Sequence, residues 1–388
     1  MSFPTPHRAV WIATQVLLAA TTALPAVAQD DHEDIVIGRY RRIHSRILDE
    51  DRTLLINLPR GYEATAIGYP VIYILYGGQV RNYFAEALHI TTLLGSTRMP
   101  AVILVGVVNT DRYRDYLPLD REGNPAGADR FLRFMVEEAM PFVEADYRTA
   151  DFRILVGPQA GGAFGLYTLT QRPETFDVYI LNNPFRYLQQ RDYLIERVRT
   201  VFAERDTLDN FLYVIAEDSD FPEALEYMPR LEEALSAKRP AQFAWKLDVV
   251  EENGDFLAPT GLREGLTLVF SGYEFPAADG VASLAEIEKY YAGLSQHYGY
   301  DVAIPDMVLA MGSDNLAQSG RVDEAIELLE RLVALYPHSL NGWWRLAGIY
   351  RERGEIERAL HYYRKCLEVD PDMVYARQMI EQLERERR

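Results

Sequence analysis

The stretch ILVGPQAGGAFGLYTLTQRPETF, from Ile154 to Phe176, decides the fold of the larger part of this chain. A short apolar run opens it, a turn of small residues follows, and an apolar pattern of helical spacing closes it. Gly157 and Gly161 stand two residues before and two residues after Gln159. This pattern predicts a buried strand that turns tightly into a helix, with Gln159 at the tip of the turn.

Similar strand-like and helix-like segments alternate up to about Phe275. Strands are predicted at Thr53–Leu58, Val71–Tyr76, Ala101–Val108, Arg153–Val156, Val178–Asn182, Phe211–Ala216 and Phe243–Val250. Helices are predicted at Tyr83–Leu94, Ala128–Tyr147, Gly162–Gln171, Pro222–Ala237 and Pro259–Phe270. Apolar strands that alternate with helices indicate the α/β class, with a mostly parallel sheet covered by helices on both faces.

From about Ser283 the sequence is helical throughout and repeats itself. Gly320 and Gly354 are 34 residues apart, and so are Ala325 and Ala359. A 34-residue period predicts tetratricopeptide repeats, here two with a final capping helix. We expect the pair of repeats to pack on the first domain or on another copy of the chain. The prominent aromatic residues of this segment are expected to be mostly repeat core: Trp343, Trp344, Tyr350, Tyr362 and Tyr363.

The first 28 residues have the features of a secretory signal peptide. His7 and Arg8 precede a mostly apolar run, and Ala26-Val27-Ala28 matches a cleavage site. We expect an exported protein, periplasmic or extracellular and soluble after cleavage; an uncleaved anchor is the alternative. The expected parts of the chain are a signal peptide (1–28), an α/β domain (29–275), a linking helix (276–304) and two repeats with a capping helix (305–388).

Composition narrows the possible partners. With 40 basic and 58 acidic residues the net charge is −18, which repels nucleic acid, so no nucleic-acid partner is expected. The single cysteine, Cys366, allows no intramolecular disulfide. No phosphate-binding glycine motif and no metal-ligand spacing occurs, so we expect neither a cofactor nor a metal.

Several stretches carry a resemblance to a known family. They include SRILDEDRTLLINLPRGY (Ser45–Tyr62), YPVIYILYGG (Tyr69–Gly78) and GLREGLTLVF (Gly261–Phe270), besides the stretch around Gln159. With them the chain resembles the putative esterases, a family of α/β-hydrolases that includes esterase D and the enterobactin esterases. Within it the chain is similar to an exported subgroup that ends in tetratricopeptide repeats. The resemblance implies an α/β-hydrolase fold and, for active members, hydrolysis of a carboxylic ester.

Two of the three catalytic side chains of such enzymes are replaced here. The G-x-S-x-G elbow carries a nucleophilic serine, and by resemblance its place is held by Gln159. The general base is a histidine in active relatives, and its place falls at Asn253 or Gly254. A carboxamide is neither basic nor nucleophilic near neutral pH, so no catalytic residue of the usual kind is expected.

The remaining parts of the site are implied by the same resemblance. The acid that orients the histidine would follow the strand Phe211–Ala216, where Glu217, Asp218 and Asp220 stand, with Asp218 or Asp220 as the expected acid. The oxyanion hole and pocket would use backbone groups, which survive side-chain replacement: Gly77, Gly78, Ala160 and Gly161.

Three functional hypotheses follow. The first is a catalytically inactive binding or scaffold protein whose pocket takes a small ester or a peptide-like ligand. The alternative is a carboxylic ester hydrolase with residual or non-triad activity, in which a carboxylate activates water. The third, compatible with the first, is that the repeats bind a protein or peptide partner or form a homodimer. Arg112 and Arg114, after the strand Ala101–Val108, are expected to be ion-paired rather than to clamp a substrate.

Overall fold

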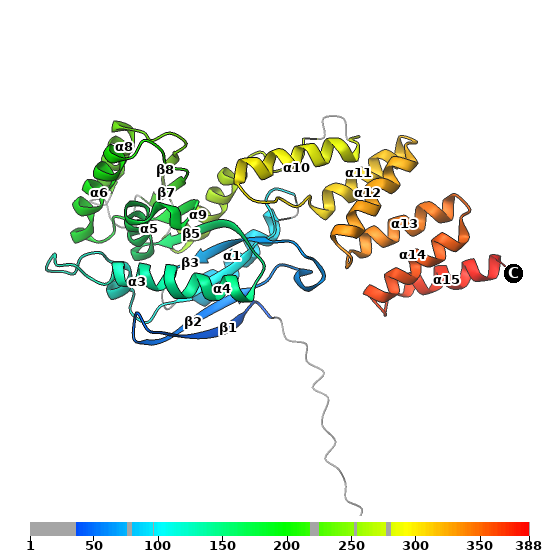
Figure 1. Cartoon of the computed structure of the whole chain (residues 1–388), viewed down its shortest axis with the longest axis horizontal. Coiled ribbons are helices and arrows are strands. Elements are labelled where there is room, and N and C mark those ends of the chain that lie inside the picture. Colours follow the sequence, from blue (N-terminus) through cyan, green and yellow to red (C-terminus); the bar gives the residue numbers. More distant parts are fainter. Residues whose placement is uncertain are drawn as a thin grey trace, which may run out of the picture. The chain divides into compact units, whose positions relative to one another are not determined.

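The structure, a computed structural model, describes residues 36–75, 80–95, 97–217, 225–251, 254–276 and 281–387. These residues form an eight-stranded sheet in the order β1-β2-β4-β3-β5-β6-β7-β8 (Figure 1). The strands are β1 (Arg39–Ser45), β2 (Glu50–Asn57), β3 (Tyr69–Ile74), β4 (Ile103–Val108), β5 (Thr149–Pro158), β6 (Val178–Asn182), β7 (Phe211–Glu217) and β8 (Ala244–Val250). β1 and β2 are antiparallel to their neighbours and β3 to β8 run parallel, so the predicted mostly parallel sheet is confirmed.

Helices cover both faces of the sheet. One face carries α3 (Ala128–Phe134), α4 (Met140–Asp146), α5 (Ala160–Gln171), α6 (Arg191–Glu204) and α8 (Tyr227–Ala237), with the short α2 (Arg112–Tyr116) beside α5. The other face carries α1 (Val80–Leu94) and α9 (Gly254–Val269). Successive side chains of β3 alternate between the faces: Val71 and Tyr73 join the first core, and Ile72 and Ile74 the second. Because both faces are buried, the strands read as continuous apolar runs.

A helical segment follows the sheet. It comprises α10 (Leu284–Tyr298), α11 (Asp306–Gln318), α12 (Val322–Leu335), α13 (Leu340–Glu352), α14 (Ile356–Val369) and α15 (Val374–Glu386). Gly320 and Gly354 lie in the turns within the helix pairs, with φ of 82° and 72°. Ala325 and Ala359 are fully buried, which lets paired helices approach closely. The predicted tetratricopeptide pattern is confirmed.

The aromatic side chains of the repeats stack on one another. The rings of Trp343 and Tyr362 lie 6.0 Å apart, and those of Tyr350 and Tyr362 lie 5.4 Å apart. Trp344 meets the buried Tyr363 edge-on at 5.2 Å. These contacts confirm that the rings serve mostly as repeat core.

The repeats share a continuous core with the sheet. Phe152 of β5 packs against the ring of Tyr298, the last residue of α10, at 5.6 Å and against that of Tyr300, just after this helix, at 5.5 Å. Phe270, after α9, meets Tyr298 at 5.5 Å. Two repeats are fewer than an isolated array needs, and here the α1–α9 side of the sheet supplies the missing apolar partner.

The sequence patterns missed or misplaced some elements. β1 was not predicted because its sequence, RYRRIHS, is charged and half exposed, as suits an edge strand. α6 was also missed. Proline is common in a first helical turn, so the sequence predicts a helix that starts at Pro259, whereas Pro259 lies inside α9, which begins at Gly254.

Candidate functional site

The turn between β5 and α5 has the geometry of a nucleophile elbow. β5 ends at Pro158, α5 begins at Ala160, and Gln159 between them has φ 54° and ψ −112°. Such a conformation costs an ordinary residue about 1–3 kcal/mol and persists only where its surroundings enforce it. Gln159 is half-buried, and its backbone N–H donates to the carbonyl oxygen of Asn182 at 2.7 Å.

The two flanking glycines are required by close packing. A β-carbon on Gly157 would lie 2.3 Å from the carbonyl oxygen of Gly161. A β-carbon on Gly161 would lie 2.8 Å from the carbonyl oxygen of Leu75, at the end of β3. The spacing of the glycines in the sequence therefore indicates a sharp turn in which neither position 157 nor position 161 has room for a side chain.

Part of the predicted oxyanion hole lies in the described chain. Ala160 is the first residue of α5 and Gly161 the second, both buried. Backbone N–H groups in a first helical turn have no partner within the helix, so they are available to an anion or a carbonyl oxygen. Gly77 and Gly78 lie outside the described residues.

A buried carboxylate stands at the end of β7. Glu217 is 2% exposed, and its Oε1 accepts a hydrogen bond from Nδ2 of Asn183 at 2.8 Å. The backbone N–H of Glu217 donates in return to Oδ1 of Asn183 at 3.2 Å. The predicted acids Asp218 and Asp220 lie outside the described residues, so Glu217 is the acid that the structure places at this edge. The sequence predicts Glu217 as one of three acids after this strand, but no local pattern predicts its pairing with Asn183.

The position predicted for the general base follows β8. Gly254 begins α9, and Asn253 lies outside the described residues. The sequence has no histidine between His89 and His297, so the loops after β5 to β8 contain none. α9 is tied to the sheet edge instead by Asn182, whose Nδ2 donates to the carbonyl oxygen of Leu257 at 3.1 Å.

Two loops that flank the elbow meet above α5. Tyr113, on α2, packs edge-on against Tyr187, after β6, with ring centroids 5.6 Å apart. The guanidinium of Arg112 donates a hydrogen bond to the hydroxyl of Tyr113 at 3.1 Å. This hydrogen bond and the positive charges of Arg112 and Arg186 lower the pKa of Tyr113, although burial acts to raise it. Burial raises the pKa of Tyr187. The cluster is cationic and aromatic, and Tyr113 is 48% exposed.

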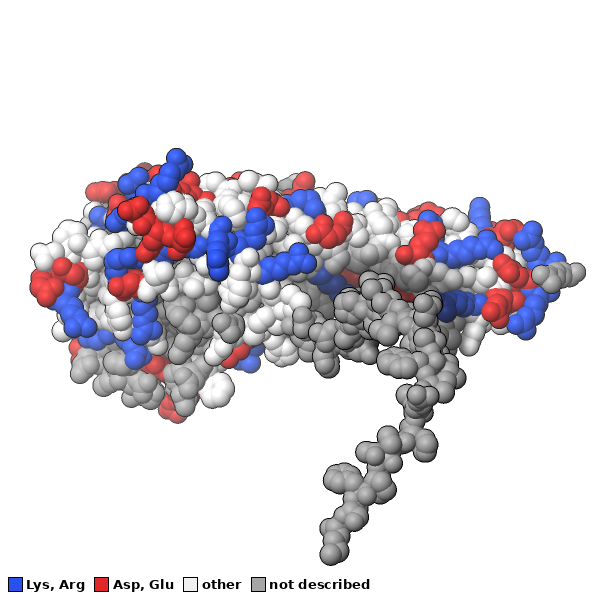
Figure 2. All heavy atoms as spheres, turned by 90° about the horizontal axis from the view of Figure 1, so that it is seen from below, with Lys and Arg blue, Asp and Glu red and all other residues white. Residues whose placement is uncertain are grey.

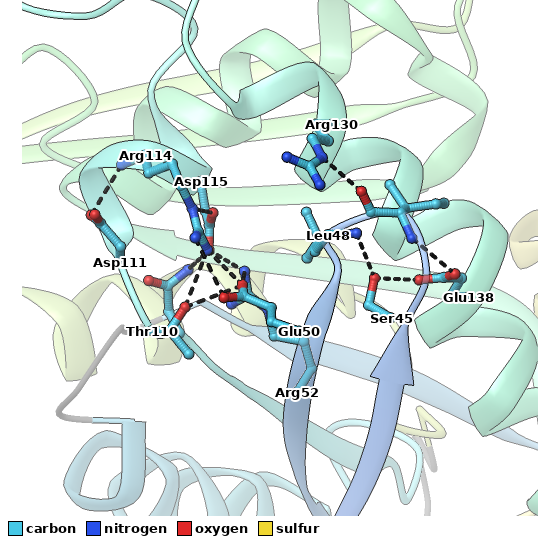
Figure 3. Close-up of polar contacts among 12 residues, drawn as sticks. Ser45, Leu48, Glu50, Arg52, Thr110, Asp111, Arg114, Asp115, Arg130 and Glu138 are labelled. Atoms are coloured by element: carbon cyan, nitrogen blue, oxygen red, sulfur yellow. Dashed lines mark hydrogen bonds and ion pairs between the residues drawn. The ribbon is translucent and has the colours of Figure 1, made fainter.

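α2 is held in place by an interior ion network (Figure 3). The guanidinium of Arg52, on β2, has no exposed surface and lies 2.5 Å from both Asp115 and Glu50. Asp115 also accepts from Arg114 at 2.6 Å and from Asn109 at 2.9 Å. Arg114 further pairs with Glu50 at 2.6 Å, so the ion pairing expected for Arg114 is confirmed. The network is structural, and it fixes the loop that presents Tyr113.

The described residues contain neither a candidate metal site nor a candidate membrane-spanning helix. No group of three or more histidine, cysteine, aspartate or glutamate side chains there is arranged to hold a metal ion. No helix in the same residues has both the length and the apolar character needed to cross a bilayer.

Comparisons with known proteins show which families and structures this chain resembles. The profile of the family named Putative esterase matches residues 45–212, and tetratricopeptide profiles match residues 290–339 and 316–383. The ferri-bacillibactin esterase BesA of Bacillus subtilis is 32% identical over 30% of this chain and 48% of its own length. The siderophore enterobactin esterase of Emericella nidulans is 35% identical over 22% of this chain and 31% of its own. The chain thus spans about half or less of the curated relatives it matches.

Solved structures agree on the fold. An IroE-like serine hydrolase from Shewanella oneidensis has a TM-score of 0.63 and 24% identity, covering 76% of this chain and 98% of its own. An uncharacterised protein from Capnocytophaga ochracea has a TM-score of 0.58 and 17% identity, covering 89% of this chain and 99% of its own. Together with the strand order and the elbow, these matches show an α/β-hydrolase fold, similar to the esterases over residues 45–212 and followed by a tetratricopeptide segment.

Proposed function

We propose that this protein binds a ligand at its elbow and does not hydrolyse it by a serine–histidine mechanism. The observation that carries the proposal is Gln159, which occupies the strained tip of the turn with φ 54°. A carboxamide cannot form an acyl-enzyme, and no histidine follows it before His297. Loss of the nucleophile alone lowers triad turnover by about 10⁶. Binding survives this loss, because the backbone amides of Ala160 and Gly161 do not depend on the serine side chain.

The surroundings of the elbow favour an anionic, aromatic ester or a peptide-like molecule as the ligand. The carboxamide of Gln159 can both donate and accept hydrogen bonds. Tyr113 offers an exposed ring beside Tyr187, and the guanidinium of Arg112 brings positive charge next to that ring. The two curated relatives are named as esterases of siderophores, so a siderophore-type ester is the first compound to test.

A carboxylic ester hydrolase with residual or non-triad activity is the second candidate. Glu217 is the buried carboxylate that could take a proton from water near the elbow. Its Oε1 accepts a hydrogen bond from Asn183 on the neighbouring strand end, which gives the carboxylate a structural partner in place of a catalytic histidine. This arrangement favours the binding proposal.

We further propose that residues 1–28 direct export and are removed, leaving a periplasmic or extracellular protein. Mass spectrometry of the exported chain should then find Gln29 at the N-terminus. The boundaries of the signal peptide, the α/β domain, the linking helix and the repeats are proposed as given from the sequence.

The repeats are proposed to bind a protein or peptide partner or a second copy of the chain. On the face in Figure 2, basic and acidic side chains are interspersed among the described residues, so charge alone does not mark a docking surface there.

Release of p-nitrophenol from short acyl esters tests the central proposal. The wild-type protein, Gln159→Ala and Gln159→Ser should all give background rates, because a serine without a base stays unactivated. In parallel, calorimetry should detect a siderophore ester binding to the wild type and more weakly to Gln159→Ala. A wild-type rate well above background that falls in Gln159→Ala would show that the elbow is catalytic.

A further inference from the structure

A second concave site lies at the other edge of the sheet from the elbow. It is a cleft of about 790 Å³, bounded by the amino ends of β3 and β4, the end of α1, the segment after α10 and the turn between α12 and α13. Tyr69, at the start of β3, lines it and pairs with Thr149, at the start of β5. The elbow follows the far end of β5, which is ten residues long, so the two sites are about 30 Å apart at about 3.3 Å per residue.

The cleft is a joint product of the sheet domain and the repeats. Gly61, beyond β2, packs so closely on the first repeat that a β-carbon there would lie 1.9 Å from Nε2 of His338. The hydroxyl of Tyr336 donates to the carbonyl oxygen of Ile304 at 2.8 Å. Ligand sites occur preferentially at such domain junctions. The elbow, built on β5 and α5, takes no residue from this cleft.

The floor of the cleft is apolar and aromatic. Tyr69, Met99, Val102 and Tyr273 line it and are buried. The exposed lining residues are mostly polar and lie at the rim, among them Arg60. An apolar floor with a few polar groups is the usual composition of a site for a small molecule or a chain end.

The cleft also holds polar groups that lack partners. Tyr300 is 9% exposed, and its hydroxyl is buried without a hydrogen-bond partner among the described residues. Burial raises the pKa of Tyr300, and the neighbouring Tyr298 adds to this, so the hydroxyl remains a donor. Nδ1 of His338 is likewise buried and unpaired within the described chain. Buried polar groups are nearly always hydrogen-bonded, so an unpaired donor in a cleft indicates an acceptor supplied by a ligand.

The charges at the rim indicate the sign of that ligand. Arg60 lines the cleft, is exposed, and makes no ion pair or hydrogen bond within the described chain. Asp306 also lines the cleft, and its Oδ1 accepts a hydrogen bond from the backbone N–H of Met307 at 2.7 Å. The carboxylate is thus partly satisfied, while the guanidinium is available to an anion.

We propose that this cleft binds a carboxylate carried on an apolar or aromatic body. The carboxylate pairs with Arg60 at the rim, the body lies on the floor formed by Tyr69 and Tyr273, and the hydroxyl of Tyr300 donates to an acceptor oxygen on the body. Two sources share this chemistry: a free small acid and the C-terminal end of a peptide.

Isothermal titration calorimetry on the full protein tests the proposal. The probes are N-acetyl-L-phenylalanine, its carboxamide, which lacks the charge, and an acetylated tetrapeptide that ends in phenylalanine with a free carboxylate. The carboxamide should bind at least about 10-fold more weakly than the acid, because hydrogen bonds to a charged group are worth about 1.5–3 kcal/mol. A peptide that binds more than about 10-fold tighter than the acid identifies a chain end as the ligand; equal affinity identifies a small acid.

Variants separate this site from the elbow and from folding defects. Arg60→Gln should weaken the acid at least about 10-fold, whereas Arg121→Gln, a matched change at another exposed arginine, should have no effect. Tyr300→Phe removes only the unpaired hydroxyl and should weaken binding about 2–10-fold without lowering the melting temperature. Gln159→Ala should leave this binding unchanged, so the proposal stands or fails separately from the function of the elbow. The proposal is overturned if no probe binds at millimolar concentration, or if the affinity of the acid is unchanged in both Arg60→Gln and Tyr300→Phe.

Discussion

Replacement of Asp115 by alanine should be among the most destabilising single changes in the sheet domain. The Asp115 side chain is 2% exposed and compensates Arg52, whose side chain has no exposed surface. Breaking a buried ion pair by removing one partner costs about 3–5 kcal/mol, because the other charge is left in the interior. Glu50 lies 2.5 Å from the same guanidinium but is 27% exposed, so it is too hydrated to replace Asp115 fully.

Urea unfolding followed by circular dichroism measures the effect. Asp115→Ala should lower the free energy of unfolding by about 3–5 kcal/mol. Glu50→Gln should lower it by less, because Asp115 still compensates Arg52 and the amide oxygen can still accept a hydrogen bond. The double variant Arg52→Met/Asp115→Leu should recover most of the loss, since neither charge is then buried.

The rings of Phe131 and Phe134, 5.6 and 5.7 Å from the Arg52 guanidinium carbon, would pack against the new methionine. The reasoning is refuted if Asp115→Ala unfolds within about 1 kcal/mol of the wild type, or if the double variant is no more stable than the single one.

Burial acts to raise the pKa of Glu50, but Arg114 and Arg52 outweigh it and hold this pKa below its ordinary value of 4.5. Because the folded-state pKa is depressed, the stability that Glu50 contributes should be lost as the pH falls below about 4.5. Acid titration of unfolding should therefore be shallower in Glu50→Gln; parallel curves would contradict this. Gly157→Ala should destabilise the protein by about 1–3 kcal/mol, measured by thermal melting, because its β-carbon would overlap the Gly161 carbonyl. Gly61→Ala, at φ 76°, should displace His338 and increase hydrogen exchange in the first repeat; unchanged protection would show that the contact is slack.

Much of the fold could be predicted from the sequence because its signals are local. Apolar strands alternating with helices gave the parallel sheet, and the 34-residue spacing of glycines and alanines gave the repeats. Gly157 and Gly161 located the elbow, because only glycine fits beside so sharp a turn. The edge strand β1 could not be predicted, because a strand that is largely exposed shows no alternation of apolar and polar residues.

The site was only partly predictable. The sequence predicts the replacement of serine and histidine, since that prediction depends only on which residue stands at which position. The pairing of Glu217 with Asn183 is not, because it depends on how the ends of β6 and β7 align.

By itself, the sequence determined the layers of the sheet domain, the helical repeats and the absence of a nucleophile at the elbow, all of which follow from short-range periodicity and residue identity. Only the tertiary structure decided that the repeats share a core with the sheet, and that Arg60, Tyr300 and His338 line one cleft. These residues are distant in sequence, and the packing that joins them is a sum of many weak contacts that no local pattern records.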